Sequence, residues 1–167
     1  EAIPTHTGLV VTSAALLAPL LVYDYVGDPG LYNQAQSWRE VFEVRKNTGL
    51  YLREHFPADT VVALNQAGII PYYAGLRTID MLGLNDVYIA HHGKRDYSLW
   101  YAHQAGDGAY VLAQQPDVII FGGRGLNIEP GDFISDRELW ASDQFHAEYE
   151  LTELPDIGFV YVRKSAP

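Results

Sequence analysis

Two short runs of apolar, largely β-branched residues constrain the fold of this chain most. They read TVVALN at residues 60–65 and DVIIF at residues 117–121. Runs without alternation are typical of strands covered on both faces, because a half-exposed strand alternates apolar and polar residues. Such strands lie in a parallel sheet with helices against it. The sequence therefore predicts an α/β fold with buried parallel strands at its centre.

The segments around these runs predict helices and a hairpin. Ser37 and Glu40 form an S-x-x-E capping box, and apolar residues then recur at three- and four-residue steps to Phe56, as in an amphipathic helix. GIIPYYAG predicts a turn or short helix, LRTIDM a second strand, and GDGAYVLAQQ a short helix. SDRELWASDQF predicts a short helix capped at Ser135 or Asp136, and AEYELTEL and GFVYVRK alternate as hairpin strands do. The expected fold is a small α/β sandwich: a short, mainly parallel sheet, flanking helices and a C-terminal antiparallel hairpin.

The first 36 residues differ in character from the rest. Residues 8–23 carry no charge, but a helix of this length would be about 24 Å long, short of the roughly 30 Å hydrocarbon core of a membrane. A signal peptide is not indicated, because no basic region precedes the apolar run and no A-x-A site follows it. Two readings stay open: the end of a transmembrane helix that begins upstream, which we favour, or a buried helix kinked or begun at Pro19. Residues 24–36 read as a linker and residues 37–167 as a single α/β domain.

Composition argues against several classes of function. The net charge of −10 repels phosphate backbones and anionic membranes, so we expect no nucleic-acid partner. The absence of cysteine removes disulfides, thiolate nucleophiles and zinc–thiolate sites. The chain also lacks the G-x-S-x-G, G-x-x-x-x-G-K-[ST], G-x-G-x-x-G and H-E-x-x-H motifs. We predict no catalytic residue and no cofactor, although a site assembled from distant residues stays open.

Polar side chains follow the predicted strands at their carboxyl ends, where ligands bind in open parallel sheets. Asn65 and Asp80 end two neighbouring strands, and Asp80 and Asp86 could form a carboxylate pair for acid–base work or hydroxyl recognition. The alternative, which we favour, is that both carboxylates accept backbone N–H groups in the turn MLGLND. The third strand is followed by GGRG, whose amides and Arg124 could hold an anion, although such glycines more often only turn the chain.

Histidines close to these carboxylates raise the question of a metal site. His91 and His92 are adjacent, His103 follows, and Asp86 or Asp96 could complete a ligand set. Adjacent side chains point apart on a strand and diverge on a helix, and no spacing here demands a metal. We therefore predict a solvated, histidine-rich loop and no metal.

Residues 39–92, REVFEVRKNTGLYLREHFPADTVVALNQAGIIPYYAGLRTIDMLGLNDVYIAHH, resemble a segment of bacterial GT-C-type membrane glycosyltransferase-like proteins. These polytopic proteins are described as arabinofuranosyltransferase- or mannosyltransferase-like, and the similar segment follows their last transmembrane helices. YVLAQQPDVIIF resembles the next element, so the resemblance covers about residues 38–121. In that superfamily the catalytic carboxylate generally lies in an extracytoplasmic loop near the N-terminal membrane helices, and the donor is usually a polyprenyl-phosphate sugar. No such loop is present in this chain, so the resemblance implies no catalytic residue in it.

The resemblance implies a soluble C-terminal domain on the periplasmic or outer face of the bacterial cell membrane, anchored by upstream helices. It would be a non-catalytic accessory domain that contacts the transmembrane part of its own parent chain, an acceptor glycan or a polyprenyl-phosphate sugar. Two alternatives stay open: a self-contained small hydrolase or transferase using Asp80, Asp86 and His91 or His92, and a structural or protein-interaction domain. The candidate contact residues are Tyr72, Tyr73, Asp80, Asn85, Asp86, His91, His92 and Arg124.

Overall fold

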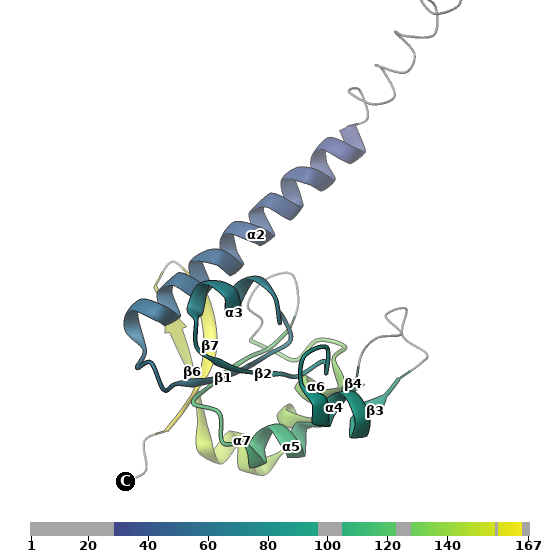
Figure 1. Cartoon of the computed structure of the whole chain (residues 1–167), viewed down its shortest axis with the longest axis vertical. Helices are drawn as coiled ribbons and strands as arrows, with labels where there is room; N and C mark the ends of the chain where they lie inside the picture. The colour runs from purple at the N-terminus through teal and green to yellow at the C-terminus, as the bar shows by residue number, and fades with distance from the viewer. Residues whose placement is uncertain (1–28, 97–104, 123–127, 156, 165–167) are drawn as a thin grey trace, which may run out of the picture. The chain divides into compact units, whose positions relative to one another are not determined.

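The computed structural model describes residues 29–96, 105–122, 128–155 and 157–164 (Figure 1). The contacts between residues divide the chain into two compact units, Glu1–Glu40 and Val41–Pro167. The apolar segment at residues 8–23 lies outside the described residues, so both readings of it stay predictions. None of the described helices combines the length and the apolar composition that a membrane crossing requires.

The main sheet of the second unit has its strands in the order β2-β1-β5-β7-β6. β2, β1 and β5 run parallel, β7 pairs antiparallel with β5, and β6 and β7 form the C-terminal hairpin. The predicted α/β class, with a mainly parallel sheet and an antiparallel hairpin at its end, is confirmed. The strands of this sheet are β1 (Val61–Leu64), β2 (Arg77–Asp80), β5 (Val118–Ile120), β6 (Tyr149–Leu154) and β7 (Gly158–Arg163).

Helices and a second, two-stranded sheet complete the described part of the chain. Antiparallel β3 and β4 pair through Lys94↔Gly106 and Arg95↔Ala105. The predicted short helices after the first strand and before the third are both present, as α3 and α5. The elements are α2 (Pro29–His55), α3 (Ile69–Ala74), α4 (Val87–His92), β3 (Lys94–Arg95), β4 (Ala105–Gly106), α5 (Gly108–Ala113), α6 (Ile134–Trp140) and α7 (Asp143–Glu148).

Two hydrophobic clusters cover the two faces of the main sheet. Val62 and Leu64 of β1 belong to a cluster with residues of α2 and α3, whereas Ala63 between them belongs to a cluster with residues of α4, α5, α6 and α7. Figure 1 shows α3 on one side of the sheet and α5 and α7 on the other. Because successive side chains of a strand point to opposite faces, burial on both faces explains why TVVALN and DVIIF contain no polar alternation.

α2 and α3 pack closely at one glycine. A β-carbon at Gly49 would lie 2.7 Å from the carbonyl oxygen of Ile70 and 2.8 Å from the β-carbon of Tyr73. Gly49 is buried, and Leu52, one turn further along α2, is fully buried in the core. A backbone carbonyl cannot move aside as a flexible side chain can, so this crossing requires glycine despite its cost in a helix interior.

Two helix starts predicted from capping residues are wrong. α2 begins at Pro29, so Ser37 and Glu40 lie inside it and residues 29–36 of the predicted linker are helical. Proline suits the first turn of a helix because a backbone N–H group at that position would have no acceptor within the helix. The segment SDRELWASDQF forms two helices, and the second is capped by Ser142, whose Oγ accepts the amide of Phe145 at 3.4 Å. Ser135 and Asp136, the predicted caps, lie within α6 and are fully buried.

Candidate functional site

The carboxylate of Asp80 closes the turn that follows β2. Its Oδ1 accepts the amide of Leu82 at 3.0 Å and its Oδ2 accepts the amide of Asn85 at 2.6 Å. Asp80 is only 3% exposed, so both oxygens are bound to backbone inside the protein. The structural alternative for Asp80 is confirmed, and the exposed Asn85 takes part through its backbone.

Asp86 has the same kind of role one turn later. It is the N-cap of α4: its Oδ1 accepts the amide of Ile89 at 2.9 Å, and its Oδ2 accepts the hydroxyl of Tyr110 at 3.3 Å. Burial, together with the charge and hydrogen bond of Asp86, raises the pKa of the Tyr110 hydroxyl. This cap and the fully buried Ile89 explain why the predicted histidine-rich loop is a helix. The loop prediction is therefore wrong for His91 and His92, whereas their predicted exposure to solvent is confirmed.

His91 and His92 end α4 with exposed side chains and diverging rings. Their ring centroids are 6.4 Å apart and their planes are inclined by 65°. The His92 ring stacks on Tyr88, and Tyr88 stacks on Tyr110 at 4.1 Å. In the described part of the chain no group of three histidine, aspartate or glutamate side chains could hold a metal ion. His103 and Arg124 lie outside the described residues.

Tyr72 and Tyr73 lie on α3, on the side of the sheet opposite α4. Tyr72 is 81% exposed, whereas Tyr73 is half-buried. The rings of Tyr72 and Tyr73 meet edge to face at 5.1 Å, and Tyr73 meets Phe42 in the same way at 6.4 Å. Tyr73 thus anchors the pair to α2, and the ring of Tyr72 stands open to solvent. The structure does not bring these tyrosines together with Asp80 or Asp86 in a single site.

Sequence reasoning missed a buried polar cluster at the carboxyl ends of β1 and β5. Asp136 of α6 accepts the side-chain amide of Asn65 at 2.6 Å through Oδ1 and the backbone amide of Gly122 at 2.7 Å through Oδ2. Burial raises the pKa of Asp136 to about 6, and the two hydrogen bonds oppose this rise. The spacing of Asp136 in the sequence is the signal that could have predicted this cluster. Asp136 lies three residues before the buried Leu139, and residues three apart share one face of a helix, so Asp136 lies on the buried face of α6.

This cluster lies where the order of the parallel strands reverses. The chain passes from β1 to β2 on one side and later returns to β5 on the other side of β1. Ligands of open α/β sheets bind at such a position. There is no free space beside Gly122, since a β-carbon there would collide with the ring of Phe133 and lie 2.6 Å from Nδ2 of Asn65. The arrangement links α6 to two strands.

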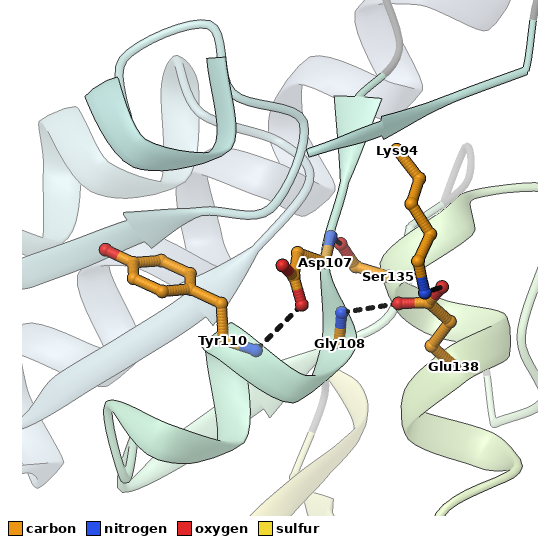
Figure 2. Close-up of polar contacts among 6 residues, drawn as sticks. All are labelled: Lys94, Asp107, Gly108, Tyr110, Ser135 and Glu138. Carbon is orange, nitrogen blue, oxygen red and sulfur yellow. Dashed lines mark hydrogen bonds and ion pairs between the residues drawn. The ribbon is translucent and has the colours of Figure 1, made fainter. Parts of the chain in front are cut away.

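A second cluster of polar side chains connects α6 to α5 and to the turn after β2 by hydrogen bonds (Figure 2). Ser135 Oγ donates to the carbonyl of Met81 and accepts the amide of Asp107, both at 3.0 Å. Figure 2 shows Glu138 between two partners: it accepts the amide of Gly108 at 2.8 Å and pairs with Lys94 at 2.5 Å. The hydrogen bond and the charge of Glu138 raise the pKa of Lys94. These polar side chains stabilise the packing of neighbouring elements.

Comparison with known protein families identifies the domain. A family model described as "Domain of unknown function (DUF8728)" matches residues 31–164. The chain belongs to the DUF8728 family. The DUF8728 match starts within α2 and ends just after β7, so it includes the entire five-stranded sheet and the helices on both of its faces. No curated protein and no solved structure matches the chain.

Proposed function

We propose that this domain is a non-catalytic accessory domain of a polytopic, GT-C-type membrane glycosyltransferase-like protein. It lies on the extracytoplasmic face of the bacterial cell membrane and is anchored by upstream helices. Its partners are the membrane part of its own parent chain and a glycan acceptor or polyprenyl-phosphate sugar. The resemblance of residues 39–92 supports the parent class, and the geometry of the carboxylates supports the non-catalytic role.

The observation that carries the proposal is that the carboxylates best placed for catalysis are bound to backbone amides. Asp80 uses both oxygens on Leu82 and Asn85, and Asp86 caps α4. A general acid or base needs a carboxyl oxygen within hydrogen-bond reach of substrate. Asp80 is buried, so such reach would require the turn after β2 to open. The self-contained hydrolase or transferase is therefore the weaker reading.

Tyr72 is the strongest candidate for contact with a glycan. Tyr72 is 81% exposed, and its ring meets that of Tyr73 edge to face. Aromatic rings present apolar faces with a polar tip, and sugars have apolar C–H faces that stack on such rings. An exposed ring that is oriented by a half-buried neighbour loses little freedom when a ligand stacks on it.

The sequence upstream of Glu1 in the native gene tests the parent class directly. We expect several further apolar segments of about 20 residues, with an acidic residue in the first extracytoplasmic loop. These segments would place catalysis in the upstream part of the parent protein. A start codon or a signal peptide immediately before Glu1 would contradict the proposal and return attention to the residues between Asp80 and His92.

The glycan contact is tested by NMR titration of the tyrosine rings with soluble manno- and arabino-oligosaccharides. We expect the ring resonances of Tyr72 to shift, while those of the buried Tyr149, 3% exposed, stay in place. Tyr72→Ala should lower the affinity about fivefold, because a stacked ring contributes about 1 kcal/mol. Tyr72→Phe, which keeps the ring and loses the hydroxyl, should bind as the wild type does. Ring resonances of Tyr72 and Tyr73 that stay in place with every sugar would favour a structural or protein-interaction domain instead, and equal affinities for all three proteins would contradict the contact at Tyr72.

A further inference from the structure

The main sheet has two edge strands, and β6 is the longer of them (Figure 1). β2, at the other edge, has four residues, whereas β6 has six. β6 pairs with β7 in one continuous register from Tyr149↔Arg163 to Leu154↔Gly158, so no bulge interrupts it. β6 also contains neither proline nor lysine, which commonly keep an edge strand from pairing with a further strand. It therefore presents a regular backbone edge.

One hydrogen bond fixes the direction of the backbone groups of β6. The amide of Lys164 donates to the carbonyl of Glu148 at 2.8 Å, so these two residues extend the register of β6 and β7 as a hydrogen-bonded pair. Such pairs alternate with non-hydrogen-bonded pairs, so the even-numbered residues of β6 direct their N–H and C=O groups towards β7. The N–H and C=O groups of Leu151 and Glu153 point to the open edge. Across the part of the chain that the structure describes, no segment forms a hydrogen bond with these outward groups.

The side chains along this edge are acidic. Glu150 and Glu153 are exposed, and neither carboxylate has an ion-pair partner among the described residues. Arg163 of β7 is paired with Asp117 at 2.6 Å, and Lys164 donates to two backbone carbonyls of α7. With its histidine counted as neutral at pH 7, α7 adds two further carboxylates. Carboxylates are therefore in excess over basic side chains along α7, β6 and β7.

Leu151 provides an apolar contact between the two carboxylates of β6. It is 43% exposed and lies opposite the buried Tyr161 of β7. Because successive side chains of a strand point to opposite faces, Glu153 shares the face of Leu151 and Glu150 lies on the other face. A strand added beside β6 would cover the exposed part of Leu151 and bring its own side chains opposite both carboxylates.

We propose that β6 binds a basic peptide in an extended conformation, which adds a further strand to the main sheet. The N–H and C=O groups of the peptide pair with those of Leu151 and Glu153, and an apolar side chain covers Leu151. Lysine or arginine side chains of the peptide lie opposite Glu150 and Glu153. Main-chain hydrogen bonds give such complexes their affinity, and the side chains that alternate along the added strand give them their specificity. This binding does not depend on the function proposed above.

Charge decides against a second copy of β6 as the occupant. Two antiparallel β6 strands with Leu151 opposite Leu151 would place the two Glu150 side chains diagonally, about 7 Å apart. A register shifted by two residues would bring either the two Glu150 or the two Glu153 side chains equally close or closer. Charges at this distance are not fully screened at physiological ionic strength, where the screening length is about 8 Å. A basic strand replaces this repulsion with attraction.

An NMR titration of the full chain with a synthetic peptide tests the proposal. Acetyl-Thr-Lys-Thr-Val-Lys-Thr-amide, antiparallel to β6, would have its valine opposite Leu151 and its lysines opposite Glu150 and Glu153. We expect the backbone amides of Leu151 and Glu153 to shift and to exchange more slowly with solvent, and those of Glu150 and Thr152 to change less. The same peptide methylated on the backbone nitrogens of its valine and first lysine should not bind, because it cannot donate to the edge. A peptide with glutamate in place of both lysines should not bind either.

A charge variant completes the experiment. Glu150→Gln combined with Glu153→Gln should lower the affinity for the lysine peptide about fivefold, with an unchanged circular dichroism spectrum. Asp59→Asn combined with Asp132→Asn removes as many exposed carboxylates from the loops before β1 and α6 and should leave the affinity unchanged. Unshifted amides at Leu151 and Glu153, or equal binding of the lysine and glutamate peptides, would overturn the proposal. Shifts at these two amides that grow with protein concentration in the absence of peptide would overturn it in favour of pairing between two copies of the chain.

Discussion

Asp80→Ala is expected to lower the free energy of unfolding by about 3 kcal/mol, because it removes two charge-assisted hydrogen bonds. The amides of Leu82 and Asn85 lose their acceptor, and at a position only 3% exposed water is a poor substitute. Urea denaturation at neutral pH, followed by circular dichroism, measures the difference.

Two further variants serve as controls for the stability of Asp80→Ala. Asp80→Asn keeps one acceptor oxygen and should cost less than Asp80→Ala. Glu54→Ala removes an exposed carboxylate from α2 and should change stability by less than about 0.5 kcal/mol. A carboxylate reserved for catalysis or binding can be removed without loss of stability. An Asp80→Ala protein as stable as the wild type would therefore refute the turn-closing role and reopen the enzyme reading.

Asp136 is expected to make the domain less stable as pH rises from about 4 to about 6. Burial raises the pKa of Asp136 from 3.8 to about 6 in the folded state. Below about pH 4 the carboxyl group is protonated in both the folded and the unfolded chain, so its ionisation has no effect on stability. Above about pH 6 it is ionised in both, and burial of the charge costs the folded state about 3 kcal/mol.

Asp136→Asn should remove this part of the pH dependence. The variant side chain has the same shape and can still accept the amide of Gly122. In the described part of the chain, Oδ1 of Asn65 has no hydrogen-bond partner. If the side-chain amide of Asn65 rotates by 180°, this oxygen can accept a hydrogen bond from the amide of the variant side chain. Relative to the wild type, the variant should gain about 3 kcal/mol between pH 4 and pH 7.

Urea midpoints at a series of pH values measure the effect of Asp136, and the carboxyl carbon shift of Asp136 should titrate with a midpoint near 6. Parallel stability profiles for the wild type and Asp136→Asn would contradict the assignment. The wild-type profile alone is not sufficient, because other carboxylates titrate in the same pH range.

The sequence predicted those features whose cause is local. Uninterrupted apolar runs revealed β1 and β5, because a strand buried on both faces excludes polar residues. The roles of Asp80 and Asp86 were likewise within reach, since their backbone partners follow within five residues. Local signals failed where two possible helix starts lie close together. Ser37 and Glu40 form a capping box, yet the helix already begins at Pro29. The residues between Pro29 and Ser37 are compatible with a helix, so the helix extends through them.

Only the tertiary structure decided which side chains meet across the chain. Asn65 and Asp136 are 71 positions apart, and Tyr88 of α4 stacks on Tyr110 of a different helix, α5. The sequence also could not predict which of two adjacent tyrosines is exposed. Tyr72 is exposed to solvent, whereas Tyr73 packs against Phe42. The sequence by itself determined the α/β class, the buried strands and the closed turn. The fold decided the cluster around Asp136 and the exposure of Tyr72, because contacts between distant residues exist only after the sheet has brought its helices together.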